Sequence, residues 1–121
     1  MMQRILVVDD DRDILEVMKY ILEDSGYEVD TLENGNFIFD KIRNNRPDLI
    51  LLDVMLGNLD GRQLCKQLKV VRDTQNIPVI LISASHTAAQ CDDIEHPDGF
   101  IPKPFDISNL LNTVQRQLMV A

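Results

Sequence analysis

Apolar runs of four residues recur along the chain and are separated by stretches with other patterns. Residues 5–8, 49–52 and 79–82 are uninterrupted runs of Ile, Leu and Val. Such runs are typical of strands covered on both faces of a parallel sheet. Residues 27–31 alternate between apolar and polar side chains, which predicts a strand at a sheet edge. A last strand is predicted at residues 99–103, where a proline favours an edge or interrupted strand.

Between these strands, apolar residues return every three or four positions, which predicts helices. The clearest helix is expected at residues 13–24, before Ser25-Gly26, and its apolar stripe comprises Ile14, Val17, Met18, Ile21 and Leu22. Further helices are predicted at 37–43, near 64–71 and from 107 onward, with Asp106 as a candidate N-cap. The weaker pattern of residues 84–97 predicts a short fourth helix.

Alternating strands and helices predict an α/β fold, in which a doubly wound parallel sheet carries helices on both faces. The chain has 121 residues, of which 45% are hydrophobic and 26% charged. This size and composition are typical of a single globular domain, expected to span residues 1–121.

Composition and charge narrow the classes of function. No apolar run is long enough to span a bilayer, and the N-terminus lacks the apolar segment of a signal peptide, so a cytoplasmic location is expected. The net charge of −8 at pH 7 disfavours direct nucleic-acid binding and favours cations or basic partners. Cys65 and Cys91 lack metal-type spacing and are interpreted as reduced thiols.

Polar residues stand where the predicted strands end. Asp9 and Asp10 follow the first strand, Asp53 ends the third, Ser83 ends the fourth, and Lys103 ends the last. Because ligands of such sheets bind beyond the carboxyl ends of the strands, these side chains are expected at one edge of the sheet.

This set of side chains suits phosphoryl transfer. Neighbouring carboxylates raise one another's pKa unless a cation lies among them, and Mg²⁺ prefers such oxygen ligands. Asp53 can act as the nucleophile that forms an aspartyl phosphate, while Mg²⁺ and the Lys103 ammonium balance the charge. The Ser83 hydroxyl can donate a hydrogen bond to a phosphoryl oxygen.

The same residues also have structural explanations, which stay open at this point. Asp53 could cap a helix after its strand, and Asp10 or Asp11 could cap the first helix. Ser83 could satisfy backbone groups at a strand end, and Lys103 could be a solvated surface residue.

Four short motifs lie at the ends of the predicted strands. They are Val7-Val8-Asp9-Asp10-Asp11, Leu51-Leu52-Asp53-Val54-Met55-Leu56 with Asp60-Gly61, Ile82-Ser83-Ala84, and Phe100-Ile101-Pro102-Lys103-Pro104-Phe105. In this order they resemble the receiver domain of a two-component response regulator, over nearly the whole chain. The resemblance implies a flavodoxin-like five-stranded parallel sheet of order 2-1-3-4-5 with five helices. It also implies a signalling domain, not an enzyme of metabolism, that can catalyse its own phosphorylation and dephosphorylation.

Carried over to this sequence, the resemblance implies that Asp53 is the phosphoacceptor. Asp10 and Asp53 would bind Mg²⁺ directly, together with the backbone carbonyl of Met55, and Asp9 would act through a water molecule. Lys103 would contact the phosphoryl group.

The resemblance further implies a conformational switch. Ser83 and Phe100 match the switch pair, in which the hydroxyl moves toward the phosphoryl group and the aromatic ring turns inward. The Lys103-Pro104 bond would be cis, which proline makes accessible.

The resemblance also implies partners. A histidine kinase or a histidine phosphotransfer protein would deliver the phosphoryl group and would dock mainly on the first helix. A downstream effector or a second copy of the chain would bind the face formed by the fourth helix, the last strand and the last helix.

Three departures from the family pattern stand out. Gly57 replaces a common proline, which predicts a more flexible loop after Asp53. Phe37, Ile38 and Phe39 replace small residues and predict different packing or association of the second helix. The span from Ser83 to Lys103 is about two residues short, which predicts an unusual output face.

Two other classes of function remain open. A phosphatase of the haloacid dehalogenase type would use Asp9-Asp10-Asp11, Ser83 and a lysine. However, Asp13 replaces the usual Thr or Val, a cap domain is lacking, and Asp53 would have no role. A receiver-like scaffold would bind partners without phosphorylation.

Overall fold

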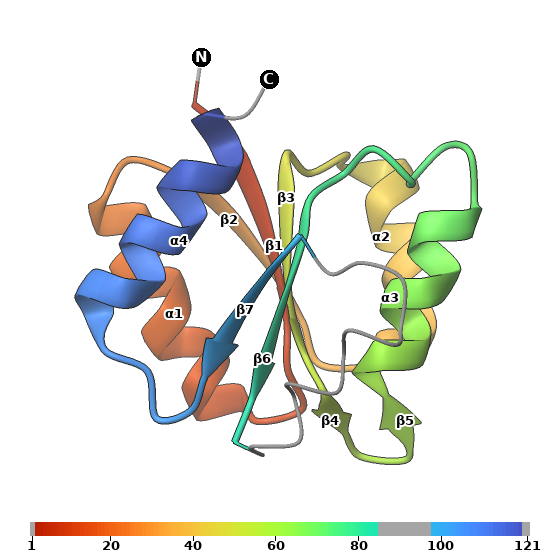
Figure 1. The fold of residues 1–121 in the computed structure, drawn as a ribbon, viewed down its shortest axis with the longest axis horizontal. Helices are drawn as coiled ribbons and strands as arrows, with labels where there is room; N and C mark the ends of the chain where they lie inside the picture. The colour runs from red at the N-terminus through yellow and green to blue at the C-terminus, as the bar shows by residue number, and fades with distance from the viewer. Residues whose placement is uncertain (1, 85–97, 120–121) are drawn as a thin grey trace.

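Five parallel strands form the central sheet (Figure 1), in a computed structural model that describes residues 2–84 and 98–119. They are β1 (Arg4–Val8), β2 (Glu28–Leu32), β3 (Leu49–Asp53), β6 (Val79–Ser83) and β7 (Gly99–Pro102). Their order in the sheet is β2-β1-β3-β6-β7. Because β4 and β5 form a separate small hairpin, this order confirms the predicted 2-1-3-4-5 topology.

Helices cover both faces of the sheet, as the alternating pattern predicts. In Figure 1, α1 (Arg12–Asp24) and α4 (Ile107–Met119) lie on one face. The other face carries α2 (Ile38–Asn44), which follows the 3₁₀ turn η1 (Gly35–Phe37), and α3 (Gly61–Val70). The predicted fourth helix lies almost entirely within residues 85–97, outside the described residues.

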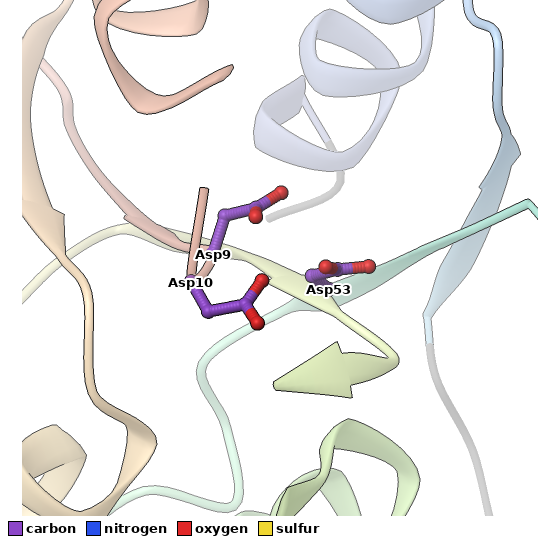
Figure 2. Close-up of side chains that lie close together, drawn as sticks. All are labelled: Asp9, Asp10 and Asp53. Atoms are coloured by element: carbon purple, nitrogen blue, oxygen red, sulfur yellow. The ribbon is translucent and has the colours of Figure 1, made fainter. Parts of the chain in front are cut away.

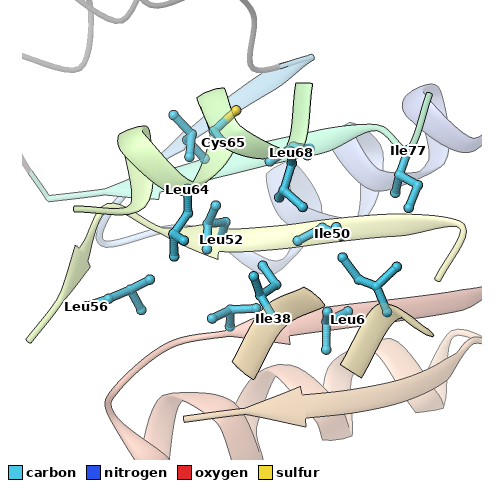
Figure 3. Close-up of a cluster of buried hydrophobic side chains, with 13 residues drawn as sticks. Leu6, Ile38, Ile50, Leu52, Leu56, Leu64, Cys65, Leu68 and Ile77 are labelled. Carbon is cyan, nitrogen blue, oxygen red and sulfur yellow. The ribbon is translucent and has the colours of Figure 1, made fainter. Parts of the chain in front are cut away.

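The core has two halves because successive strand residues point to opposite faces of the sheet. Leu6, Ile50 and Leu52 belong to the cluster on the α2 and α3 side (Figure 3). Val7 and Leu51 belong to the cluster on the α1 and α4 side. All five residues of β3 and of β6 are buried, which confirms that the uninterrupted apolar runs are central strands.

The apolar stripe predicted for the first helix is only partly correct. Met18 and Leu22 are buried, but Leu15 completes the buried face, whereas Val17 is 54% exposed. The helix begins one residue earlier than predicted because the Asp11 carboxylate accepts hydrogen bonds from the backbone N–H groups of the first turn. The side of α1 that carries Val17 therefore faces solvent.

Two apolar residues at the ends of predicted helices, Val71 and Ile107, are exposed rather than part of a buried stripe. Val71 is the C-cap residue that follows α3, and Ile107 is the first residue of α4, so both lie at helix ends beyond the sheet. The predicted Asp106 cap is confirmed, because its carboxylate accepts a hydrogen bond from the Asn109 N–H at 2.6 Å. Within the described segments, no helix has the length and apolar character needed to cross a bilayer.

A small hairpin, absent from the sequence prediction, follows β3. It pairs β4 (Met55–Leu56) with β5 (Leu59–Asp60), and two-residue strands are too short for a periodic pattern to reveal. Gly57 takes a positive φ of 62° at its turn, a conformation that glycine adopts without steric cost.

The three apolar residues at the start of the second helix lie in different environments. Ile38 is fully buried, Phe39 packs partly against the core, and Phe37 is exposed in η1.

Candidate metal centre

Three carboxylates meet at the carboxyl ends of β1 and β3. In the parallel register Val8 lies opposite Leu52, so the next residues, Asp9 and Asp53, come side by side. Asp10 follows in the loop that leads to α1. Figure 2 shows the three side chains gathered at this edge of the sheet, and one carboxylate oxygen from each lies within 4.8 Å of the others.

This arrangement fits a small, hard cation. Two oxygens bound to one Mg²⁺ at about 2.1 Å can be at most about 4.2 Å apart, so the separation of these carboxylates is close to that of groups that share one ion. Asp10 is exposed, and it lines a cavity of about 360 Å³ together with Glu33, Asn34, Asn36 and residues 56–59. A cation can therefore reach the Asp10 carboxylate from this side.

Asp9 is the most buried of the three acids. It is 1% exposed, and its Oδ1 accepts a hydrogen bond from the backbone N–H of Asp11 at 2.9 Å. Its Oδ2 lies 3.3 Å from the Lys103 ammonium. Burial raises the pKa of Asp9, against the lowering effects of the Asp11 N–H and of Lys103. Both oxygens thus already have partners in the protein.

Asp53 is the second buried acid, and it does not cap a helix. It ends β3 and is followed by β4, whereas the N-cap of α3 is Asp60. Burial and the charge of Asp9 raise the pKa of Asp53 to about 6, despite the opposing effects of Lys103 and of the backbone N–H of Met55. The cap interpretation of Asp53 is therefore wrong.

Lys103 supplies the positive charge of the site. Its Nζ lies 3.3 Å from Asp9 Oδ2 and 3.4 Å from Asp53 Oδ1. Its backbone N–H donates to the carbonyl of Ser83 at 2.8 Å, which extends the pairing of β7 with β6. The interpretation of Lys103 as a solvated surface residue is wrong, and the predicted cis bond to Pro104 is present.

The other predicted site residues lie around this cluster. Ser83 is buried at the end of β6, one residue beyond Ile82, which is opposite Asp53 in the register. Met55 begins β4, and its side chain is exposed. Phe100 lies opposite Leu81 in β7 and packs partly against the α2 and α3 side of the core, away from the carboxylates.

Reasoning from the sequence missed the contact of Gly61 with the site. A Cβ atom at this position would lie 2.0 Å from the carbonyl oxygen of Asp53, because the first residue of α3 passes directly against the end of β3. The Gly61 N–H donates to the Val54 carbonyl at 2.7 Å. The only sequence signal was the Asp60-Gly61 pair, which by itself predicts no more than a turn and a helix start.

Sequence comparison identifies the family of the chain. Residues 5–115 match the family model of the response regulator receiver domain. The chain is 40% identical to the response regulator MprA of Mycobacterium sp. (strain KMS) over 112 residues, which cover 89% of this chain and 47% of that protein. It therefore spans about half the length of the curated relatives that it matches.

Solved structures of the same architecture agree with this match. A putative response regulator from Chloroflexus aurantiacus J-10-fl superposes with a TM-score of 0.91 at 28% identity, covering 98% of both chains. The chemotaxis protein CheY4 of Vibrio cholerae superposes with a TM-score of 0.87 at 29% identity, covering 96% of this chain and 98% of that chain.

Proposed function

The chain belongs to the response regulator receiver domain family of two-component signalling, and from this premise we propose that Asp53 accepts a phosphoryl group in an Mg²⁺-dependent reaction. The observation that carries the proposal is the meeting of Asp9, Asp10 and Asp53 with Lys103 at one edge of the sheet. Among the described residues, this cluster combines a buried candidate nucleophile, a candidate metal site and a neighbouring cation.

The chain's own residues provide most of the chemistry. The ionised Asp53 carboxylate attacks phosphorus and forms an O–P bond, while the bond between phosphorus and the donor's nitrogen breaks and its electron pair leaves with the donor imidazole. Lys103, already close to Asp53, contacts the phosphoryl oxygens and balances their charge. Without a metal ion, the ionised form of Asp53 prevails above about pH 6, because burial and the charge of Asp9 raise its pKa to about 6.

Mg²⁺, when bound, supplies charge neutralisation for the phosphoryl oxygens. We assign its direct ligands to Asp10, Asp53 and the backbone carbonyl of Met55. Asp9 acts through a water molecule, an assignment supported by its burial and by the partners that its two oxygens already have.

Ser83 and Phe100 form the proposed switch pair. The Ser83 hydroxyl binds a phosphoryl oxygen, and Phe100 turns inward, which changes the surface of β7 and α4. Two observations support this assignment. Ser83 is buried and follows Ile82, the residue that pairs with Asp53 in the sheet. Phe100 is half-buried and packs partly against the core. The added charge thereby favours one of two packings of the same domain.

The proposed phosphodonor is a histidine kinase or a histidine phosphotransfer protein that docks on α1, and the proposed place of action is the cytoplasm. The proposed downstream partner, an effector or a second copy of the chain, binds at the β7 and α4 face. The exposed Val17 and Tyr20 side chains on α1 support the first docking surface.

Intact mass spectrometry after incubation with acetyl phosphate tests the proposal. We expect the wild type to gain one phosphate when Mg²⁺ is present and none when EDTA replaces it. The Asp53→Asn variant should gain none, and Asp73→Asn, which replaces an exposed acid in the connection between α3 and β6, serves as the matched control.

Two outcomes would contradict the proposal. An adduct that persists in Asp53→Asn but disappears in Asp9→Asn would favour the phosphatase mechanism. No adduct in any variant, with acetyl phosphate or with phosphorylated kinases, would favour a scaffold.

A further inference from the structure

The edge strand β7 leads directly to Lys103 at the site, but few hydrogen bonds hold this strand in the sheet. It has four residues and pairs only with β6 in the described sheet. Pro102 has no N–H to donate to the strand pairing. Because a change in the register of a strand would relocate every residue on it, something must fix β7 if Lys103 is to reach Asp53 reliably.

Asp98, the residue before β7, joins the amino-terminal ends of both strands. Its backbone N–H donates to the carbonyl of Val79 at 2.8 Å. Its carboxylate Oδ2 accepts a hydrogen bond from the N–H of the same Val79 at 2.9 Å. Asp98 therefore holds the first residue of β6 through both its backbone and its side chain.

Lys69, in the last turn of α3, completes this contact. Its Nζ lies 2.6 Å from Asp98 Oδ2 and also donates to the carbonyls of Ile77 at 2.8 Å and Gln75 at 3.4 Å. Only 14% of the Lys69 side chain is exposed, and three acceptors restrict its ammonium. From the other face of the sheet, the Gln117 side chain of α4 donates to the Asp98 carbonyl at 2.7 Å.

This group lies at the opposite end of the strands from the carboxylates. Val79 begins β6, whereas Ile82, opposite Asp53, lies three residues further along the strand. Lys69 and Asp98 therefore do not belong to the candidate metal centre. The route from Asp98 to the site that we consider runs along β7 to Lys103.

We propose that Lys69 and Asp98 are positioning residues: their ion pair fixes the amino-terminal end of β7 and thereby sets where Lys103 meets Asp53. The inference rests on the proposed role of Lys103 in phosphoryl transfer. It assigns a function to an ion pair that joins residues 29 positions apart in the sequence.

Hydrogen exchange measures the fixation of β7 without any phosphorylation. In Lys69→Met, which keeps an apolar stem of similar length, we expect the β7 amides to exchange about tenfold faster than in the wild type, because a charged hydrogen bond is lost. Lys69→Arg should restore much of the protection. The matched control is Arg4→Met, which removes the ion pairs to Glu28 and Asp30 on the opposite edge strand and should leave β7 unchanged.

A double-mutant cycle tests whether the effect passes through Lys103. With acetyl phosphate and Mg²⁺, Lys69→Met should slow phosphorylation at least threefold in the wild-type background and have no further effect in Lys103→Met. Asp98→Asn, which keeps an oxygen for the Val79 N–H but removes the charge, should behave like Lys69→Met.

Two results would overturn the inference. One is unchanged exchange of the β7 amides in both Lys69→Met and Asp98→Asn. The other is an equal slowing by Lys69→Met with and without Lys103, which would indicate a general structural effect. If the wild type accepts no phosphate at all, the proposed function fails, and the exchange experiment alone then decides whether the ion pair fixes β7.

Discussion

At Asp53, the buried carboxylate that suits the proposed function lowers the stability of the fold. Asp53 is only 4% exposed and has a second buried acid, Asp9, as a neighbour. The cost of ionising it in this place is what raises its pKa to about 6. A cation bound beside Asp53 would balance its charge and so offset the cost of ionising it at this buried position.

The pKa of Asp53 predicts a pH-dependent effect of its replacement. A folded-state pKa of about 6, above the ordinary 3.8, means that the native state holds this proton more tightly than the unfolded state. The contribution of Asp53 to the unfolding free energy therefore falls as pH rises through about 4 to 6 and stays low above that range. Asp53→Asn removes this penalty.

We expect Asp53→Asn to be more stable than the wild type at about pH 8 in EDTA, by on the order of 3 kcal/mol, and the difference to shrink toward about pH 4. Urea titrations at several pH values measure it. Asp73→Asn should show no such trend. A difference that is independent of pH, or a less stable Asp53→Asn at pH 8, would contradict the burial argument.

The close approach of Gly61 to Asp53 predicts a steric effect of replacing this glycine. In Gly61→Ala the new Cβ would meet the Asp53 carbonyl at 2.0 Å, so α3 or the end of β3 must shift. We expect a loss of about 1–3 kcal/mol of unfolding free energy and slower phosphorylation by acetyl phosphate.

Gly35→Ala is the matched control for Gly61→Ala. Its Cβ would meet the Leu64 Cδ1 atom at 2.6 Å, which is the movable end of a side chain and not backbone. It should therefore slow phosphorylation much less. Equal rates in the two variants would show that the close approach of Gly61 to Asp53 has no functional consequence.

The site residues differ in how far the sequence could reveal them. Asp9, Asp53 and Lys103 were predictable because they end strong apolar runs, and parallel strands bring such ends together. The contact of Gly61 with the Asp53 backbone was not, because a close approach between two elements leaves no periodic pattern. The Lys69 and Asp98 pair was hidden for the same reason: it depends on how the end of α3 packs against β6 and the residue that precedes β7.

At the scale of elements, α1 combines a buried stripe with an apolar solvent face. Leu15, Met18 and Leu22 face the sheet, whereas Val17 and Tyr20 are exposed one turn apart. The spacing rule could not separate these sets, because isoleucines and valine on the flanks of the helix widen the apparent stripe. The exposed pair contributes nothing to the core and is available to a partner.

We therefore expect the double variant Val17→Ser/Tyr20→Ser to affect partner transfer selectively. Its phosphorylation by acetyl phosphate should match the wild type, and its unfolding free energy should change by about 0.5 kcal/mol or less per site. Transfer from a histidine kinase that phosphorylates the wild type should slow at least tenfold, as measured by the loss of label from the kinase.

An exposed pair elsewhere provides the control for α1. Val70→Ser/Met119→Ser changes two exposed apolar residues at the ends of α3 and α4, and should leave transfer from the kinase unchanged. Equal slowing by both double variants would place the docking surface elsewhere.

At the scale of the whole molecule, the net charge of −8 and the three clustered acids make divalent cations favourable ligands. A ligand that binds only the native state raises the unfolding free energy by mass action. We expect Mg²⁺ at about ten times its Kd to add about 1.4 kcal/mol, seen as a higher Tm than in EDTA.

Asp10→Asn should remove most of this Mg²⁺-dependent rise in Tm, because Asp10 is the exposed acid of the cluster. Asp73→Asn should keep it. An equal rise in Asp10→Asn and in the wild type would mean that Mg²⁺ binds outside the three carboxylates.

The architecture of the whole chain was the most predictable level. Uninterrupted apolar runs gave the central strands, and the alternating residues 27–31 gave the edge strand β2, because burial on one or both faces leaves a direct pattern in the sequence. The hairpin of β4 and β5 escaped prediction, since its two-residue strands depend on the turn at Gly57 and on contacts with the rest of the fold.

The central claim is that Asp53 receives the phosphoryl group, and locating the modified residue tests it most directly. The protein is phosphorylated with acetyl phosphate and Mg²⁺, reduced with borohydride, which converts an aspartyl phosphate to homoserine, and then digested for peptide sequencing by mass spectrometry. If Asp53 receives the phosphoryl group, homoserine appears at position 53 and aspartate is unmodified at positions 9 and 10. Homoserine at position 9 or 10, with aspartate intact at position 53, would contradict the central claim.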